Sequence, residues 1–268
     1  LDPDKIDYLL RDSLFCGVPF GESVNRDRLK SSIKYDSERK RLAITSKGVD
    51  AVEALVFTNY LMYRNVYWHH GVRSASAMFK RAVQEILLHP ECQLDGNRFH
   101  LLTESELIAQ LKSEQQRLQL TGSAQLLDGT IYRRLYKVGA VINPSERKRA
   151  LMEYLYELFH NPVKRREKEI ELCHMFSKKL GRPLSGHEIL IDIPGFNKSP
   201  EVDLKVFYGP KNPSDKADPL TFDNPEVTRL RDSLLDNFED QAKIFRIFCI
   251  DDPQLRTLVR NEAKRYLN

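Results

Sequence analysis

The first twelve residues concentrate polar side chains at a spacing that a helix would align. Asp4, Tyr8 and Asp12 stand at i, i+4 and i+8, so a helix would place them one above another on a single face. Lys5 would flank that face. Such a face could offer one carboxylate to a metal ion, a lysine and a phenol to phosphate, and a second carboxylate to a sugar hydroxyl. On spacing alone, a solvated helix with Asp–Lys and Asp–Arg pairs is the commoner explanation.

The elements that would position these residues follow from hydrophobic periodicity and helix-ending residues. In the first part of the chain the pattern predicts a helix over residues 4–15, a hairpin over 32–45, one long helix or two in series over 49–88, and a helix from a capping box at 103–106 to about 119.

The composition of the chain changes near residue 120, where β-branched and aromatic residues become frequent. Helices are expected over residues 144–159, 163–180, 225–238 and 252–267, strands over 130–142, 189–193, 202–208 and 244–250, and a mobile loop over 209–224. We expect these strands to share one sheet. The sequence therefore predicts a mostly α (α+β) protein with a helical part over residues 1–120 and a lobe over 121–268 that carries a short, mainly antiparallel sheet.

Composition excludes several classes of protein. Hydrophobic residues make up 41% of the 268 and charged residues 30%, which suits a packed core and not a disordered chain. No uncharged apolar stretch reaches the length of a membrane span. The four cysteines include no CxxC pair, which argues against a zinc ribbon or a disulfide scaffold and favours the reducing cytoplasm. A net charge of +4 is compatible with anionic small molecules such as nucleotides.

Several phosphate-binding and nucleophile motifs are absent from the sequence. The sequence contains no GxxxxGK[ST], no GxGxxG after a predicted strand and no GxSxG. It therefore carries no motif of a P-loop nucleotide-binding protein, of a Rossmann dinucleotide-binding domain or of the nucleophile elbow of α/β-hydrolases. Basic residues over 147–149 and 164–168 could attract nucleic acid. Because glutamates interleave with them, a solvated helix with i,i+4 pairs is the favoured interpretation. A basic nucleic-acid-binding module stays as an alternative.

Residues 1–12 resemble a known motif. Asp4-Lys5-Ile6-Asp7-Tyr8-Leu9-Leu10-Arg11-Asp12, after Leu1-Asp2-Pro3, is similar to the D-x-D-K-x-D-Y-x-x-R-D segment of HD-superfamily phosphohydrolases. The nearest branch is the deoxynucleoside triphosphate triphosphohydrolases. Met62-Tyr63-Arg64-Asn65 resembles that family's helix with a phosphate-binding arginine, and the segments 135–139, 189–193, 203–209 and 245–249 resemble strands of its C-terminal lobe. Residues 1–120 would then be the C-terminal part of an HD-type helical domain.

The resemblance implies a role for each matching residue. Asp4 would be the fourth protein ligand of a divalent metal ion, whether Mg, Mn, Fe, Ni or Zn. The substrate-binding residues would be Lys5, Tyr8 and Arg64 at the phosphates and Asp12 at the deoxyribose 3′-hydroxyl. The implied reaction is metal-dependent hydrolysis of a nucleotide phosphate ester or anhydride, with dNTP conversion to deoxynucleoside and triphosphate as the specific case. Asp7 is expected to form a salt bridge or a cap instead.

The sequence departs from the family pattern in its metal ligands. None of its seven histidines is followed by aspartate, so the His…His-Asp ligands are not in this sequence. We therefore expect an N-terminal HD half to be supplied by the same or a separate chain, within a homo-oligomer. The alternative is a catalytically incomplete scaffold. Val72 replaces a substrate-contacting tyrosine, and of the activator-site residues around Ser32 and 45–47 only Lys47 keeps a matching charge.

Overall fold

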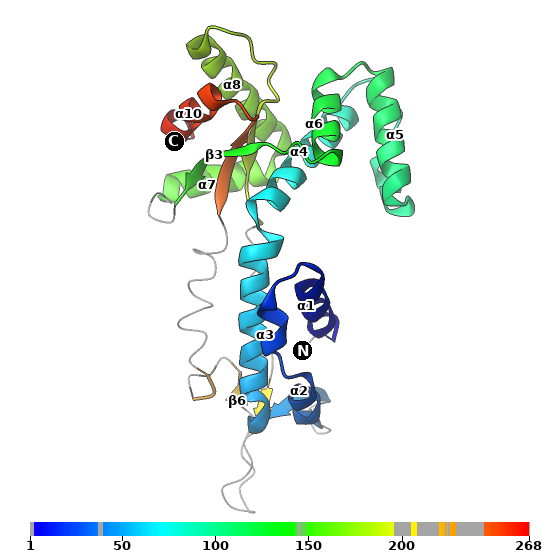
Figure 1. The fold of residues 1–268 in the computed structure, drawn as a ribbon, viewed down its shortest axis with the longest axis vertical. Coiled ribbons are helices and arrows are strands. Elements are labelled where there is room, and N and C mark those ends of the chain that lie inside the picture. The colour runs from blue at the N-terminus through cyan, green and yellow to red at the C-terminus, as the bar shows by residue number, and fades with distance from the viewer. Residues whose placement is uncertain are drawn as a thin grey trace, which may run out of the picture. The chain divides into compact units, whose positions relative to one another are not determined.

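The computed structural model describes residues 3–36, 40–143, 146, 148–195, 205–207, 220–222, 224, 226–228 and 244–267. Within these residues the protein is mostly helical and has two small sheets (Figure 1). The predicted α+β, mostly helical class is confirmed. The chain forms two compact units, one of residues 1–69 with 197–243 and one of residues 70–196 with 244–268. The expected domain boundary near residue 120 stays a prediction.

The first unit contains the helix that carries the polar motif. Gly17 follows that helix with a positive φ of 65°, a conformation that glycine adopts without strain. Asn25 then caps the next helix by accepting a hydrogen bond from the Arg28 amide. Its elements are α1 (Pro3–Phe15), η1 (Pro19–Ser23), α2 (Arg26–Ser32), β1 (Ile33–Asp36), β2 (Arg41–Thr45), η2 (Ser46–Gly48), α3 (Val49–Met62), the π-helical turn η3 (Tyr63–Tyr67), β5 (Lys205–Phe207) and β6 (Leu220–Thr221).

The sheet of the first unit has the strand order β1-β2-β5-β6. Strands β1 and β2 pair antiparallel, with Ile33 opposite Ile44, and the predicted hairpin is confirmed. Strand β5 pairs parallel with β2, with Val206 opposite Ile44, and β6 pairs antiparallel with β5. The expectation that all later strands share one sheet is therefore wrong. Pairing across about 160 residues leaves no local trace in a sequence, because each partner reads only as a short apolar run.

One apolar cluster holds the first unit together. Leu9 of α1, Leu29 of α2 and Met62 of α3 are fully buried in it, together with Ile44 and Val206 from the sheet. Leu9 therefore anchors α1 against α3, while Tyr8 packs at the margin of this cluster and Asp4 is exposed.

The second unit packs helices on both faces of a three-stranded antiparallel sheet. The strand order is β3-β7-β4, and side chains alternate along β7: Ile247 lies in the cluster with α7, α8 and α10, while Phe248 lies in the cluster with α4, α5 and α6. The elements are α4 (His70–Leu87), η4 (Gly96–Leu101), α5 (Glu104–Arg117), α6 (Thr121–Ile131), β3 (Lys137–Ile142), α7 (Arg149–His160), α8 (Pro162–Leu180), β4 (Ile189–Asp192), β7 (Phe245–Cys249), α10 (Pro253–Glu262) and η7 (Ala263–Tyr266).

Buried ion pairs fix α4 within this unit. Arg81 donates to Glu169 of α8 at 2.5 Å, with only 4% of either side chain exposed. Arg73 donates two hydrogen bonds to the carboxylate of Asp192 in β4, from Nε at 2.8 Å and from Nη2 at 2.5 Å. Breaking a buried pair by removing one partner leaves an uncompensated charge, so these pairs specify where α4 packs on the sheet and on α8.

Most predicted elements of the second unit are confirmed, with one clear error. The capping box at Thr103 and Glu106, the start of α8 after Asn161 and its end at Gly181 all occur as predicted. The strand predicted over 130–142 begins only at Lys137, because Thr130 and Ile131 end the unpredicted helix α6. Packing of α6 on α4 overrides the β propensity of these residues. The helix predicted over 225–238 lies outside the described residues apart from 226–228, where 226 and 227 form a turn. The loop predicted over 209–224 lies outside them apart from 220–222 and 224, and there the prediction is wrong, because Leu220–Thr221 pair with β5 as strand β6.

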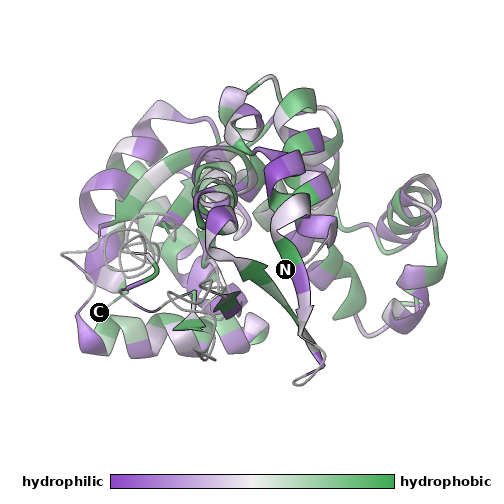
Figure 2. Ribbon diagram, turned by 90° about the horizontal axis from the view of Figure 1, so that it is seen from below, coloured by the Kyte–Doolittle hydropathy of each residue, from purple (hydrophilic) through white to green (hydrophobic). Residues whose placement is uncertain are grey.

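Hydropathy along the ribbons fits this packing. Purple and green alternate along the helices in Figure 2, as expected for helices that bury one face and expose the other. Among the described helices, none combines the length and the apolar character needed to cross a lipid bilayer.

Candidate functional site

Helix α1 presents the motif residues as the spacing predicts. The helix runs from Pro3 to Phe15, so Asp4, Tyr8 and Asp12 succeed one another turn by turn. Asp4 is exposed, whereas Lys5, Tyr8 and Asp12 are partly buried. Asp7 forms an i,i+4 ion pair with Arg11 at 2.9 Å, which confirms the prediction that Asp7 makes a salt bridge.

The segment with Arg64 forms an irregular turn. Residues Tyr63–Tyr67 are π-helical, and the Trp68 amide donates to the Tyr63 carbonyl at 2.8 Å, an i to i+5 bond. Single π turns occur frequently at functional sites, since the extra residue turns the following side chains to new directions. Arg64 is exposed, and its Nη1 donates to the Tyr60 hydroxyl at 3.2 Å.

The π turn and α1 meet through Tyr67. The Tyr67 hydroxyl donates to Asp12 Oδ2 at 2.8 Å, across 55 residues of sequence. The Tyr67 ring lies edge-on to Tyr8, with ring centroids 6.3 Å apart, and edge-on to Tyr63 at 5.2 Å. The structure thus brings Asp12 and Tyr8 together with the turn that carries Arg64. Sequence reasoning missed Tyr67, whose only signal was its place three residues after Arg64 in a tyrosine-rich segment.

At this contact a charged carboxylate, Asp12, is paired with a neutral phenol, Tyr67. Burial, and next the hydrogen bond to the Asp12 carboxylate, raise the pKa of the Tyr67 phenol above its ordinary value, so the phenol stays protonated and remains a donor. No lysine or arginine in the described part of the chain forms an ion pair with Asp12. Asp12 is therefore a partly buried carboxylate whose one hydrogen-bond partner is a neutral donor.

The residues described here do not by themselves fit a metal ion. The structure places no group of three or more His, Cys, Asp or Glu side chains together anywhere in its described residues. Asp4 would contribute one carboxylate, and a catalytic ion needs three or four protein ligands. Adjacent His69 and His70 are both exposed. The metal ion that the family resemblance implies finds no complete donor set in this part of the chain.

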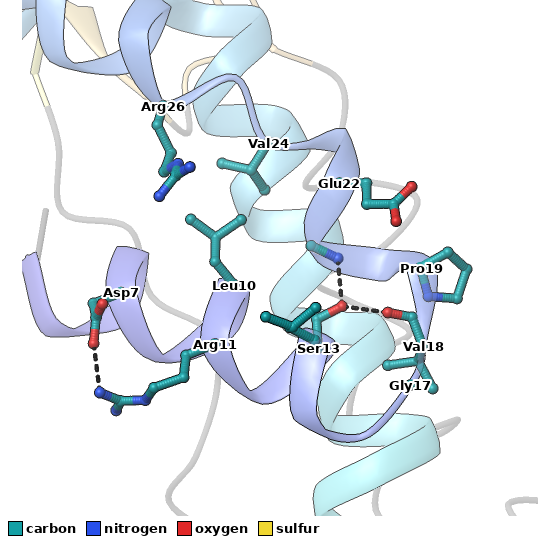
Figure 3. A pocket seen from close by; sticks show the side chains of 12 residues that line it. Asp7, Leu10, Arg11, Ser13, Gly17, Val18, Pro19, Glu22, Val24 and Arg26 are labelled. Carbon is teal, nitrogen blue, oxygen red and sulfur yellow. Dashed lines mark hydrogen bonds and ion pairs between the residues drawn. The ribbon is translucent and has the colours of Figure 1, made fainter.

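A pocket of about 750 Å³ opens beside the neighbouring face of α1 (Figure 3). Leu10 and Val24 line it, and the Asp7–Arg11 pair and Arg26 lie at its edge. The Ser13 hydroxyl donates to the Val18 carbonyl at 2.5 Å and accepts from the Gly21 amide at 2.8 Å, which holds η1 against α1. None of the five motif-derived residues lines this pocket; its walls are residues 7, 10, 11, 13, 14, 17–19, 21, 22, 24 and 26.

Comparison with protein families decides the relationship of the chain. The model of the HD-associated region matches residues 24–212. The chain belongs to the HD-associated region family. This membership relates it to the HD superfamily, as the motif in α1 and the Arg64 segment led us to expect. The matched residues include the π turn with Arg64 and Tyr67, most of the second unit, and strand β5.

Two proteins of known sequence align with part of this HD-associated chain. An uncharacterised Methanocaldococcus jannaschii protein is 40% identical over 84 residues, which are 31% of this chain and 19% of that protein. An uncharacterised Bacillus subtilis protein is 31% identical over 94 residues, 35% of this chain and 20% of its own length. The chain therefore covers about a fifth of these relatives.

Two solved structures share the fold. A hypothetical protein from Aquifex aeolicus superposes with a TM-score of 0.55 and 20% identity, covering 99% of this chain and 57% of that one. A phosphohydrolase from Bacteroides thetaiotaomicron gives a TM-score of 0.55 and 19% identity, covering 94% of this chain and 61% of its own. At such identities the likeness establishes the fold alone.

Proposed function

We propose that this HD-associated chain forms the substrate-binding side of an HD-type phosphohydrolase that cleaves a nucleotide phosphate ester or anhydride. The specific candidate reaction is conversion of a deoxynucleoside triphosphate to deoxynucleoside and triphosphate. The observation that carries the proposal is the contact between α1 and the π turn, where Tyr67 joins Asp12 and Tyr8. Two segments that separately resemble the family's substrate-binding motifs are adjacent in space.

Each residue has a role that suits its chemistry. Lys5 and the Tyr8 hydroxyl would donate hydrogen bonds to phosphate oxygens. Arg64 would bind a phosphate through its planar guanidinium, which matches two oxygens at once. Asp12 would accept a hydrogen bond from the sugar 3′-hydroxyl. The positive charges of Lys5 and Arg64 would offset the negative charge that builds up on the phosphate group under attack.

The proposed enzyme also needs a divalent metal ion, Mg, Mn, Fe, Ni or Zn, which would activate water. Asp4 would supply one ligand. The other ligands would come from an HD half outside this sequence, on the same or a separate chain, in a cytoplasmic homo-oligomer. Without those ligands no catalytic step follows from the residues described here.

A nucleic-acid-binding role is less well supported. Three cations of the basic run in α8 are paired with carboxylates: Arg166 binds Glu85 through two bonds of 2.7 Å, Lys168 binds Glu171 at 3.0 Å, and Lys164 binds Glu157. Cations engaged in this way would have to exchange partners before they could neutralise phosphates of a nucleic acid.

The decisive experiment measures nucleoside and triphosphate release from deoxynucleoside triphosphates by the full-length protein with each candidate metal. We expect Asp4→Ala to abolish turnover while the fold is retained, because Asp4 is exposed and outside the core. Asp7→Ala is the matched control, since Asp7 lies on the same helix and forms a surface ion pair with Arg11. Wild-type-like turnover of Asp4→Ala would remove Asp4 from the metal site and overturn the proposal.

A further inference from the structure

The Asp12–Tyr67 pair is an unusual way to hold a partly buried carboxylate. Carboxylates taken partly out of water are normally paired with cations. Asp12 instead accepts from a phenol at 2.8 Å, and in the described residues no cation joins it. One carboxylate oxygen is fixed by this bond. The other oxygen stays available as an acceptor, and the neutral donor does not cancel the negative charge that the two oxygens share.

Tyr67 is itself held in place on several sides. Its backbone belongs to the π turn, and its ring lies between the edges of Tyr8 and Tyr63. Val66 and Tyr67 also pack against the apolar cluster that anchors α1. A donor on such a rigid support orients its acceptor with little loss of side-chain entropy.

We propose that Tyr67 is a positioning residue, which orients Asp12 so that its second oxygen accepts a hydrogen bond from a sugar hydroxyl of the ligand. The inference rests on the proposed function and adds Tyr67, which the family resemblance does not assign. A neutral donor orients the carboxylate without cancelling its charge. The charged carboxylate therefore attracts a hydroxyl donor and repels phosphate, which an arginine partner in place of Tyr67 would not ensure.

The geometry of α1 sets the distance between the two ends of such a ligand. Lys5 and Asp12 are seven residues apart, so they lie on nearly the same face of the helix, separated by about 10 Å along its axis. A ligand that reaches both must carry a phosphate group and a hydroxyl about that far apart. A nucleoside with a chain of phosphates has this layout. Inorganic polyphosphate has no hydroxyl-bearing sugar, so Asp12 would reject it.

The first part of the test asks whether the bond exists, independently of any activity. Thermal unfolding of the full-length protein is compared for wild type, Tyr67→Phe, Asp12→Ala and the double variant. If the bond is present, the loss in Tm of the double variant is smaller than the sum of the two single losses. Tyr35→Phe, at an exposed tyrosine of β1, is the control and should combine additively with Asp12→Ala.

The second part asks whether Tyr67 serves recognition of a hydroxyl. We compare kcat/KM on a deoxynucleoside triphosphate and on its 3′-deoxy analogue. We expect Tyr67→Phe to lose about tenfold or more on the substrate with the 3′-hydroxyl, and less than about twofold on the analogue. Asp12→Ala, which removes the acceptor, should show the same selective loss. A residue that merely supports the fold would lower both values equally.

Each outcome separates the inference from the proposed function. Additive Tm losses would show that no bond couples Asp12 and Tyr67, and would overturn the inference whatever the enzyme does. Coupled losses with equal damage on both substrates would also overturn it, while the proposed function would stand. Coupled losses with selective damage support both. If wild type turns over neither nucleotide, the proposed function fails, and the recognition role of Tyr67 fails with it.

Discussion

Two aspartates of α1 show how the partner of a carboxylate determines what it can do. Asp7 pairs with Arg11 on the surface, where 68% and 56% of the two side chains are exposed. Such a pair contributes about 0–1 kcal/mol and leaves little charge for a ligand. Asp12, five residues later, is partly buried and bonded to a phenol. The phenol does not neutralise the Asp12 carboxylate, which therefore suits the binding of a hydrogen-bond donor on a ligand.

Arg64 provides a prediction at the scale of a single residue. Its guanidinium is exposed and, among the described residues, donates to the neutral Tyr60 hydroxyl at 3.2 Å. Replacing it with alanine would remove the proposed phosphate contact and no part of the core. If the proposed function holds, Arg64→Ala in the full-length protein should raise KM for a nucleotide about tenfold or more, with a Tm close to wild type.

Arg149→Ala is the control for that variant, because Arg149 is also exposed but lies in α7, in an i,i+4 pair with Glu153. It should leave KM unchanged. If Arg64→Ala had the kcat and KM of the wild type, Arg64 would not contact the substrate, and the phosphate end of the proposed site would lose its arginine.

At the scale of elements, local signals predicted helices well and long-range pairing poorly. Asn161, Pro162 and Gly181 mark both ends of α8, because capping and the left-handed conformation are properties of a few neighbouring residues. The pairing of β5 with β2, and the contact of Tyr67 with Asp12, depend on segments far apart in sequence. Composition and periodicity carry no information about such partners.

The same limit applies to the candidate site. The i, i+4, i+8 spacing was enough to place Asp4, Tyr8 and Asp12 on one helix, and the resemblance was enough to single out Arg64. Tyr67 was not accessible in this way. A π turn breaks the 3.6-residue period, so extending the helical pattern of α3 through the turn would give Tyr67 the wrong direction.

Glu114 gives a pH-dependent prediction for the attachment of α5. Its carboxylate accepts from Arg117 Nε at 2.9 Å and from the Gln93 amide at 2.6 Å, and so ties α5 to the chain after α4. The hydrogen bonds from Arg117, and next the one from Gln93, lower the pKa of Glu114 to about 2 from its ordinary value of 4.5. The unfolded chain therefore binds this proton more readily than the folded one.

The direction of the pH dependence follows from the lower pKa of Glu114 in the folded state. Between pH 4.5 and 2 the unfolded state takes up more protons, so the stabilisation by Glu114 is complete above pH 4.5 and is lost as the pH falls towards 2. The difference in urea midpoint between wild type and Glu114→Gln should shrink over this range. Ser113→Ala, an exposed and non-titrating change on α5, should give a difference that does not vary with pH. A constant difference for Glu114→Gln would contradict the prediction.

At the scale of the whole molecule, the division into two compact units has an energetic counterpart. The first unit is built around one apolar cluster, in which Leu29 is fully buried. The second unit has its own clusters on the two faces of its sheet, and Leu172 is fully buried in one of them. Neither leucine shares a cluster with the other, so each should stabilise its own unit.

Hydrogen exchange on the chain of residues 1–268 tests this independence. A buried leucine replaced by alanine costs about 2–5 kcal/mol, which corresponds to at least about 30-fold faster exchange wherever the protecting structure opens. Leu29→Ala should accelerate exchange in α3 and leave β7 at the wild-type rate, and Leu172→Ala should do the reverse. If either variant accelerated both elements equally, the two units would unfold as one cooperative structure, and damage to the second unit would reach α1 and the π turn as well.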